Sequence, residues 1–179
     1  MKKLSAFMLA AAISVPFASA SAGVVDPYAG ISVAGANAYF SGGLDNSPYT
    51  ALGVQAGIKV PFVRGELEYN RMFHKDLSMG LGAVNLYLEP FPFIPVVSPY
   101  VGIGFGRVFD AKVDGVTLNS VGLFQSMLGL GVSIPKFPVR FDAELRGIFA
   151  GDMNPKTDTF DKTAVMGAFE LRLKASYVF

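Results

Sequence analysis

Apolar residues alternate with small or polar residues along most of this chain, and this period of two is the feature that most limits its fold. Successive side chains of an extended strand point to opposite faces, so such alternation predicts β-strands with one apolar face. In the segment 124–134 the apolar face comprises Phe124, Leu128, Leu130, Val132 and Ile134. The other face of that segment comprises Gln125, Met127, Gly129, Gly131 and Ser133.

The same alternation recurs about eight times. The segments are 29–34, 52–62, 63–70, 84–88, 101–106, 124–134, 139–146 and 165–179. A helix that spans a bilayer needs about 20 consecutive apolar residues. The best candidate, 115–135, is interrupted by four glycines. A tilted strand crosses a bilayer with only about 10 residues, so the sequence predicts membrane-crossing strands.

A soluble β-sandwich would show the same alternation, so other features must decide between a sandwich and a barrel. The second face carries glycine on some strands and charge on others, which suits a narrow enclosed lumen. Tight connections marked by proline, at Pro61, 89–99 and 135–138, alternate with polar stretches. These polar stretches are 37–50, 107–120 and 151–162. Short periplasmic turns and longer outer loops alternate in this way in outer-membrane barrels.

Aromatic residues gather near the ends of the predicted strands. One group comprises Tyr28, Phe62, Phe137, Tyr177 and Phe179, and the other comprises Tyr39, Tyr69, Phe73, Phe109 and Phe149. Two such groups would form the aromatic girdles at the two membrane interfaces. We therefore predict an all-β fold, an eight-stranded antiparallel up-and-down transmembrane β-barrel.

The composition agrees with an apolar wall that faces lipid. Hydrophobic residues make up 51% of the chain and charged residues only 16%, and the mean hydropathy is +0.42. The chain has no cysteine, and its net charge of +1 gives no support to nucleic-acid binding.

The first 22 residues have the features of a cleaved secretory signal peptide. Lys2 and Lys3 precede an apolar run over 4–17, and Ala-x-Ala sequences follow at 18–20 and 20–22. We predict export to the bacterial outer membrane and a single barrel domain over 23–179.

Charged residues at inward positions are expected to form a network in the lumen. They are Lys59, Arg64, Glu66, Glu68, Arg140, Asp142, Glu144, Arg146, Glu170, Arg172 and Lys174. The lumen of an eight-stranded barrel is just wide enough for side chains to fill, and glycines on neighbouring strands leave room for long charged side chains. Two interpretations stay open: a plug of ion pairs, or a narrow porin-like channel for small or apolar solutes.

Short sequences recur between the two halves of the chain. PYAGI at 27–31 resembles PYVGI at 99–103, and VRGELE at 63–68 resembles VRFDAE at 139–144. Either two four-strand modules close one barrel, or barrel strands have converged on similar sequences. In both cases the third and seventh strands, which carry most of the charge, would face each other across the lumen.

Arg71 and Arg107 lie at positions that face lipid. An outward Arg costs roughly 2–4 kcal/mol at the bilayer midplane and about 0–1 kcal/mol near an interface, so we expect both at the outer rim. There they would contact lipopolysaccharide phosphates, or extend toward water without binding a particular lipid.

Catalytic and metal-binding patterns are missing. His74 is the single histidine, and its spacing from Asp76 and Ser78 does not define a catalytic triad. The polar residues Asp152, Asn154, Asp158 and Asp161 do not follow the spacing of a calcium loop. We therefore predict no enzymatic activity, no metal and no cofactor.

Three short motifs carry a family resemblance: PYVGIG at 99–104 after a proline turn, NLY at 85–87, and the final YVF at 177–179. They resemble the small outer-membrane barrels of the opacity and OmpA-like type, including porin-like surface antigens. The resemblance covers essentially all of 23–179. It implies a structural protein, adhesin or antigen whose partners are outer-membrane lipid, lipopolysaccharide and an extracellular ligand of the loops. Tyr177 and Phe179 resemble the terminal signal that the barrel-assembly machinery recognises.

Deletion of Phe179 is expected to impair insertion into the outer membrane, because it removes the terminal residue of this assembly signal. The measurement is heat-modifiable migration on a gel, in which a folded barrel runs differently before and after boiling. A deletion variant that accumulates in the outer membrane with unchanged heat-modifiable migration would contradict the assignment.

Overall fold

The computed structural model describes residues 25–40, 47–73, 77–90, 96–113, 116–117, 119–134, 136–153 and 164–179. The predicted signal peptide, 1–22, lies outside these residues. The strands are β1 (Asp26–Phe40), β2 (Ser47–Lys59), β3 (Val63–Phe73), β4 (Leu77–Leu88), β5 (Val97–Val113), β6 (Val116–Thr117), β7 (Val121–Ser133), β8 (Val139–Met153) and β9 (Ala164–Val178). No helix of the described residues is long and apolar enough to cross a membrane.

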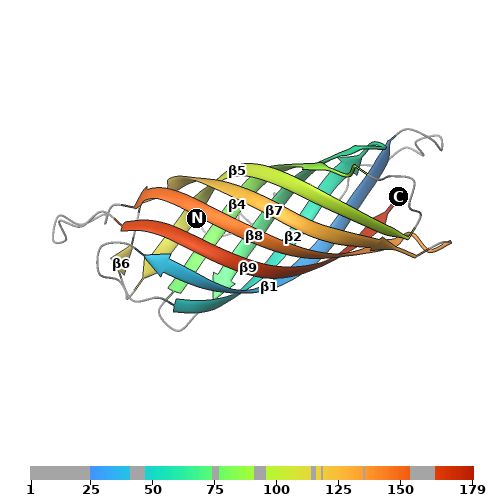
Figure 1. Cartoon of the computed structure of the whole chain (residues 1–179). Helices are drawn as coiled ribbons and strands as arrows, with labels where there is room; N and C mark the ends of the chain where they lie inside the picture. The colour runs from blue at the N-terminus through green and yellow to red at the C-terminus, as the bar shows by residue number, and fades with distance from the viewer. Residues whose placement is uncertain are drawn as a thin grey trace, which may run out of the picture.

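Eight long strands close into an antiparallel barrel, and they run obliquely to its axis (Figure 1). The order around the barrel is β1, β2, β3, β4, β5, β7, β8 and β9. The barrel closes because β9 also pairs with β1, with Tyr28 opposite Val178 and Phe40 opposite Met166. The short strand β6 pairs with the end of β5. The predicted eight-stranded up-and-down barrel is therefore confirmed.

The two faces of the wall are inverted relative to a soluble protein. Large apolar side chains lie outside, where Ile31 is 65%, Leu67 62% and Phe169 67% exposed. Charged side chains such as Glu68 and Arg146 are buried inside. Because successive residues of a strand point to opposite faces, the alternation read from the sequence separates these two groups.

The strands are longer than the alternation alone predicts. They contain 11 to 17 residues if the two-residue β6 is set aside. Strand structure therefore extends into the expected loops, at 37–40 and 47–50, 107–113 and 151–153. Strand pairing depends on backbone hydrogen bonds, so it continues where the side chains no longer alternate between apolar and polar.

The two ends of the barrel are named here by their connections. The turn end holds the connections between β2 and β3, between β4 and β5 and between β7 and β8, and also the last residue, Phe179. The loop end lies at the opposite ends of these strands, where β1, β3, β5 and β8 finish.

Nine of the ten aromatic residues expected in the two girdles are exposed, and Tyr28 is the exception. The exposed residues are Phe62, Phe137, Tyr177, Phe179, Tyr39, Tyr69, Phe73, Phe109 and Phe149. Tyr28 is buried, and its hydroxyl donates a hydrogen bond of 2.9 Å to Glu66 Oε2. The assignment of Tyr28 to the outer rim was wrong. Alternation along β1 places its side chain on the inward face together with Ser32, although Tyr28 lies near the end of the strand.

Close packing of the barrel interior makes Gly106 sensitive to substitution. A Cβ atom there would overlap the carbonyl oxygen of Gly82 and lie 2.8 Å from Ala83 Cα, both backbone atoms that cannot swing away. Gly122, on the adjacent β7, has open space around its Cβ position.

Gly106→Ala is therefore expected to lower the free energy of unfolding by about 1–3 kcal/mol, as overpacking does. Gly122→Ala is the matched control and should leave it nearly unchanged. Urea unfolding in detergent micelles measures both variants, and equal stabilities would contradict the proposed close approach between β4 and β5.

Candidate functional site in the barrel lumen

The charged residues of the lumen balance one another. The basic ones are Lys59, Arg64, Arg140, Arg146, Arg172 and Lys174, and all but Lys59 are buried. The buried acidic ones are Glu66, Glu68, Glu89, Asp142, Glu144 and Glu170. Glu89, which lies in a predicted turn, brings the carboxylates to the same number as the cations.

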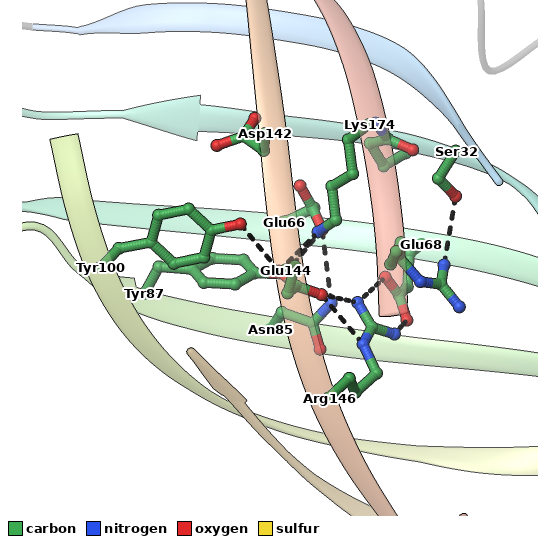
Figure 2. A network of polar contacts seen from close by, with 12 residues as sticks. Ser32, Glu66, Glu68, Asn85, Tyr87, Tyr100, Asp142, Glu144, Arg146 and Lys174 are labelled. Carbon is green, nitrogen blue, oxygen red and sulfur yellow. Dashed lines mark hydrogen bonds and ion pairs between the residues drawn. The ribbon is translucent and has the colours of Figure 1, made fainter. Parts of the chain in front are cut away.

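Arg146 forms the centre of the network and joins opposite sides of the lumen (Figure 2). It extends from β8 and pairs with Glu68 of β3, the strand that lies across the barrel. It also pairs with Glu144 Oε1 at 2.7 Å and donates a hydrogen bond of 3.1 Å to Gln125 Oε1. Its guanidinium group therefore ties β3, β7 and β8 together.

Lys174 of β9 lies beside this centre and joins two further carboxylates. Its Nζ atom is 2.9 Å from Glu66 Oε1 and 3.2 Å from Glu144 Oε2. It also donates a hydrogen bond of 2.8 Å to the Tyr87 hydroxyl oxygen. Tyr100 donates a hydrogen bond of 3.1 Å to Glu144 Oε2, and Tyr87 donates one of 3.0 Å to Glu66 Oε1. Each of these carboxylates therefore accepts a hydrogen bond in addition to its ion pair.

A second arginine, Arg172 of β9, extends the network toward the loop end. Its Nη2 is 2.7 Å from Glu170 Oε2, and its Nη1 donates to Asn70 Oδ1 and, at 3.1 Å, to Ser32 Oγ. Tyr49 donates a hydrogen bond of 2.8 Å to the other oxygen of Glu170. The pair is thereby linked to β1, β2 and β3.

A turn-end cluster closes the other side of the network, and it consists of Lys59, Arg64, Glu89, Arg140 and Asp142. Glu89 lies just beyond β4, 2.7 Å from Lys59 Nζ and 3.0 Å from Arg140 Nη2. Asp142 Oδ1 is 3.0 Å from Arg140 Nε and 3.4 Å from Arg64 Nη1. Burial raises the pKa of Glu89, but the cations outweigh it and hold that pKa below its ordinary value of 4.5.

Arg64 is held by aromatic rings as well as by carboxylates. Its guanidinium carbon lies 4.2 Å from the ring centre of Tyr87 and 4.8 Å from that of Tyr100. Arg64 Nη2 and Asp142 Oδ2 are buried without a hydrogen-bond partner. Stacking on electron-rich ring faces compensates part of the cost of burying this guanidinium group.

The lumen near the loop end is apolar, unlike the charged lumen that was predicted. The loop-end apolar cluster comprises Ala34, Ala38, Tyr49, Ala51, Met72, Met79, Leu81, Ala83, Val108, Ala111, Leu123, Ile148, Ala150, Met166 and Ala168. Met72, Leu81 and Ile148 are completely buried inside the barrel. Extending the alternation of inward positions along each strand identifies the members of this cluster except Ala111, which is buried because of an irregularity in the pairing of β4 with β5.

The other predicted site residues lie on the outer wall. Arg71 is half-buried and donates a hydrogen bond of 2.9 Å to Ser78 Oγ, and Arg107 is exposed. Tyr177 and Phe179 are exposed near the turn end, with their ring centres 5.2 Å apart.

The residues considered for catalysis or metal binding are mostly in undescribed segments. His74, Asp76, Asn154, Asp158 and Asp161 lie outside the described residues. Within the described part of the chain, no group of three or more His, Cys, Asp or Glu side chains could hold a metal ion. The lumen side chains bind mainly one another, so their arrangement is suited to filling the barrel.

Arg146→Ala is expected to reduce the free energy of unfolding by about 3–5 kcal/mol, because Glu68 and Glu144 would stay buried without their shared cation. Lys59→Ala removes a cation that is 25% exposed, and should cost only about 1 kcal/mol or less. Chemical unfolding in micelles measures both. Equal losses for the two variants would refute the central role of Arg146.

The Glu89 carboxylate should make part of the stability depend on pH. Since its pKa is lowered in the folded protein, its stabilising effect is complete above 4.5 and is lost as the pH falls through the lower folded value. Glu89→Gln should therefore unfold at a lower temperature than wild type at pH 7, and the difference should shrink at acidic pH. Thermal unfolding across this range measures it, and a difference independent of pH would argue against the ion pairs.

Comparison with known proteins finds no matching family model and no curated protein of significantly similar sequence. Solved structures do match. Neisserial surface protein A is 18% identical with a TM-score of 0.70, and the match covers 86% of this chain and 97% of that protein. The N-terminal β-barrel domain of Pseudomonas aeruginosa OprF is 13% identical with a TM-score of 0.50, over 84% of this chain and 97% of that domain. At these identities the likeness concerns the fold, and at that level it confirms the resemblance to small outer-membrane barrels.

Proposed function

We propose that this chain is an integral protein of the bacterial outer membrane with a structural and cell-surface role. The observation that carries the proposal is the inverted wall, with exposed apolar residues outside and paired charges inside. In water, so large an apolar surface would drive association, whereas in a bilayer it matches the surrounding lipid. The fold that the chain has in common with Neisserial surface protein A, a protein named for its surface location, supports the same assignment.

The proposed orientation follows from the connections. The turn end would face the periplasm, and the loop end, which has the longest connection, the one between β8 and β9, would face the exterior. An extracellular ligand would meet the segments 41–46, 74–76 and 154–163, which lie outside the described residues.

Tyr177 and Phe179, at the turn end, would be the residues that the barrel-assembly machinery recognises.

We propose further that the lumen is plugged and does not conduct. Two successive barriers support this: the charged network through the turn end and centre, and the loop-end apolar cluster. An ion would have to break buried pairs in the first and lose its hydration in the second, and both steps are costly. The alternative, a narrow porin-like channel for small or apolar solutes, would require both barriers to open. The proposal includes no catalytic activity.

Location can be tested by separating inner and outer membranes by density after expression of the full chain. We expect the protein in the outer-membrane fraction, as a band whose migration changes on boiling. Recovery of the folded protein in the soluble periplasmic fraction would overturn the proposal.

Conduction can be tested by recording currents across planar bilayers that contain the refolded protein. We expect no stepwise currents from wild type, although protease protection of the same samples should demonstrate insertion. Arg140→Ala is the comparison, because it loosens the turn-end cluster and leaves the apolar cluster in place. Regular current steps from inserted wild-type protein would favour the channel alternative.

A further inference from the structure

Among the side chains that the structure describes, the outward charges at the loop end lie on one side of the barrel. Arg71 of β3 and Arg107, Asp110 and Lys112 of β5 lie there, on the two strands that flank β4. On β1, β2, β7, β8 and β9, the outward side chains described at this end include no charged residue. This side of the wall therefore carries three cations and one carboxylate.

A β-bulge places the third cation on the outer wall. Ser78 of β4 pairs with Lys112, and Gly80 pairs with Phe109, so β5 has one extra residue between these pairs. Asp110 lies in the bulge with φ of 48°, a left-handed conformation that Asp tolerates. As a result Ala111 is buried and Lys112 is exposed. Strict alternation from Arg107 would have pointed Lys112 into the lumen.

The three cations surround one short stretch of β4, residues 78–82. Arg71 donates its hydrogen bond to Ser78, and Lys112 is the direct strand partner of Ser78, with Cα atoms about 5 Å apart in such a pair. Arg107 is the strand partner of Gly82. The surface formed by Arg71, Arg107, Lys112 and 78–82 is called the cationic face below.

The floor of the cationic face is made of glycines covered by aromatic rings. A Cβ atom at Gly80 would lie 3.0 Å from the Tyr69 hydroxyl oxygen, and one at Gly82 would lie 3.0 Å from Phe109 Cε2. Both rings are partly exposed and belong to the aromatic residues near the loop end. The cations therefore lie at the level of an aromatic girdle, where lipid headgroups meet acyl chains.

We propose that the cationic face binds the phosphate groups of a phosphorylated glycolipid in the outer leaflet. Three cations against one carboxylate provide the charge complementarity, and guanidinium groups are suited to bidentate contact with phosphate. The apolar wall below the cationic face favours a lipid over a soluble anion as the ligand. The acyl chains of a lipid would cover this wall, and a soluble anion would not. This inference rests on the proposed outer-membrane location.

The test uses the protein refolded into phosphatidylcholine vesicles that contain bis-phosphorylated lipid A or the same lipid A with both phosphates removed. Insertion is verified first by heat-modifiable migration. The temperature of unfolding is then followed as the lipid A content rises, since a ligand that binds the folded state stabilises it. Wild type should be stabilised by the phosphorylated lipid and much less by the dephosphorylated one.

Variants then assign the effect to the cationic face. Lys112→Gln should weaken the apparent affinity roughly fivefold, the size expected for one cation near a charged membrane surface. The combination Arg71→Gln, Arg107→Gln and Lys112→Gln should abolish the response. Asp110→Asn removes the carboxylate but tolerates the same backbone conformation, so it should strengthen binding. Lys136→Asn, at the turn end, is the control and should behave as wild type.

Two results would overturn the proposal: equal stabilisation of wild type by both forms of lipid A, or a full response from the triple variant. Either result in protein that has inserted normally would leave the outer-membrane assignment intact. Failure of wild type to insert at all would instead contradict the proposed function together with this inference.

Discussion

Backbone hydrogen bonding in an apolar environment is the constraint on which the rest of this structure depends. An unpaired N–H or C=O group in lipid costs several kcal/mol, so a spanning sheet must pair every strand on both sides. Here the pairing of β9 with β1 meets that requirement, since it leaves no free edge in the ring. Closure with eight strands also sets the diameter of the lumen, at a width that side chains can fill.

That narrow lumen explains how so many charges are buried. Long side chains from opposite strands reach each other across it, as Arg146 of β8 reaches Glu68 of β3. Inward glycines provide the space: a Cβ atom at Gly131 would overlap Arg140, and one at Gly129 would overlap Tyr100. Buried ion pairs contribute little net stability compared with apolar packing, but losing one partner is costly. We infer that the network favours this arrangement of the strands, because a shift in register would separate the paired charges.

The outer wall and much of the lumen could be predicted from the sequence, because alternation is a local property of each strand. Arg64, Asp142 and Lys174 are buried inside, as the alternation indicates. The third and seventh long strands were expected to face each other under either interpretation of the repeat, and the Arg64–Asp142 pair joins these strands, β3 and β8. The inward direction of the Tyr28 side chain was not predicted, and neither was that of Glu89, which lies in the predicted turn, because residue type near a strand end says little about where a side chain points. The outward direction of the Lys112 side chain could not be predicted. The bulge at Asp110 reverses the alternation of inward and outward positions in β5, and this bulge depends on the pairing of β5 with β4.

The division of the lumen into a charged part and an apolar part bears on where function can lie. Inside, most of the described groups contact other groups of the barrel: carboxylates pair with arginines, tyrosine hydroxyls donate to carboxylates, and three methionines pack in the loop-end apolar cluster. A binding site in the lumen would have to compete with these contacts, at a cost of several kcal/mol for each buried pair broken. On the outer wall, by contrast, the large apolar side chains of the described strands are exposed. A barrel that fills its own interior in this way leaves its outer surface as the place for recognition. A wall that only contacts lipid needs apolar side chains, and the cationic face is the part of the described wall that carries charged side chains instead.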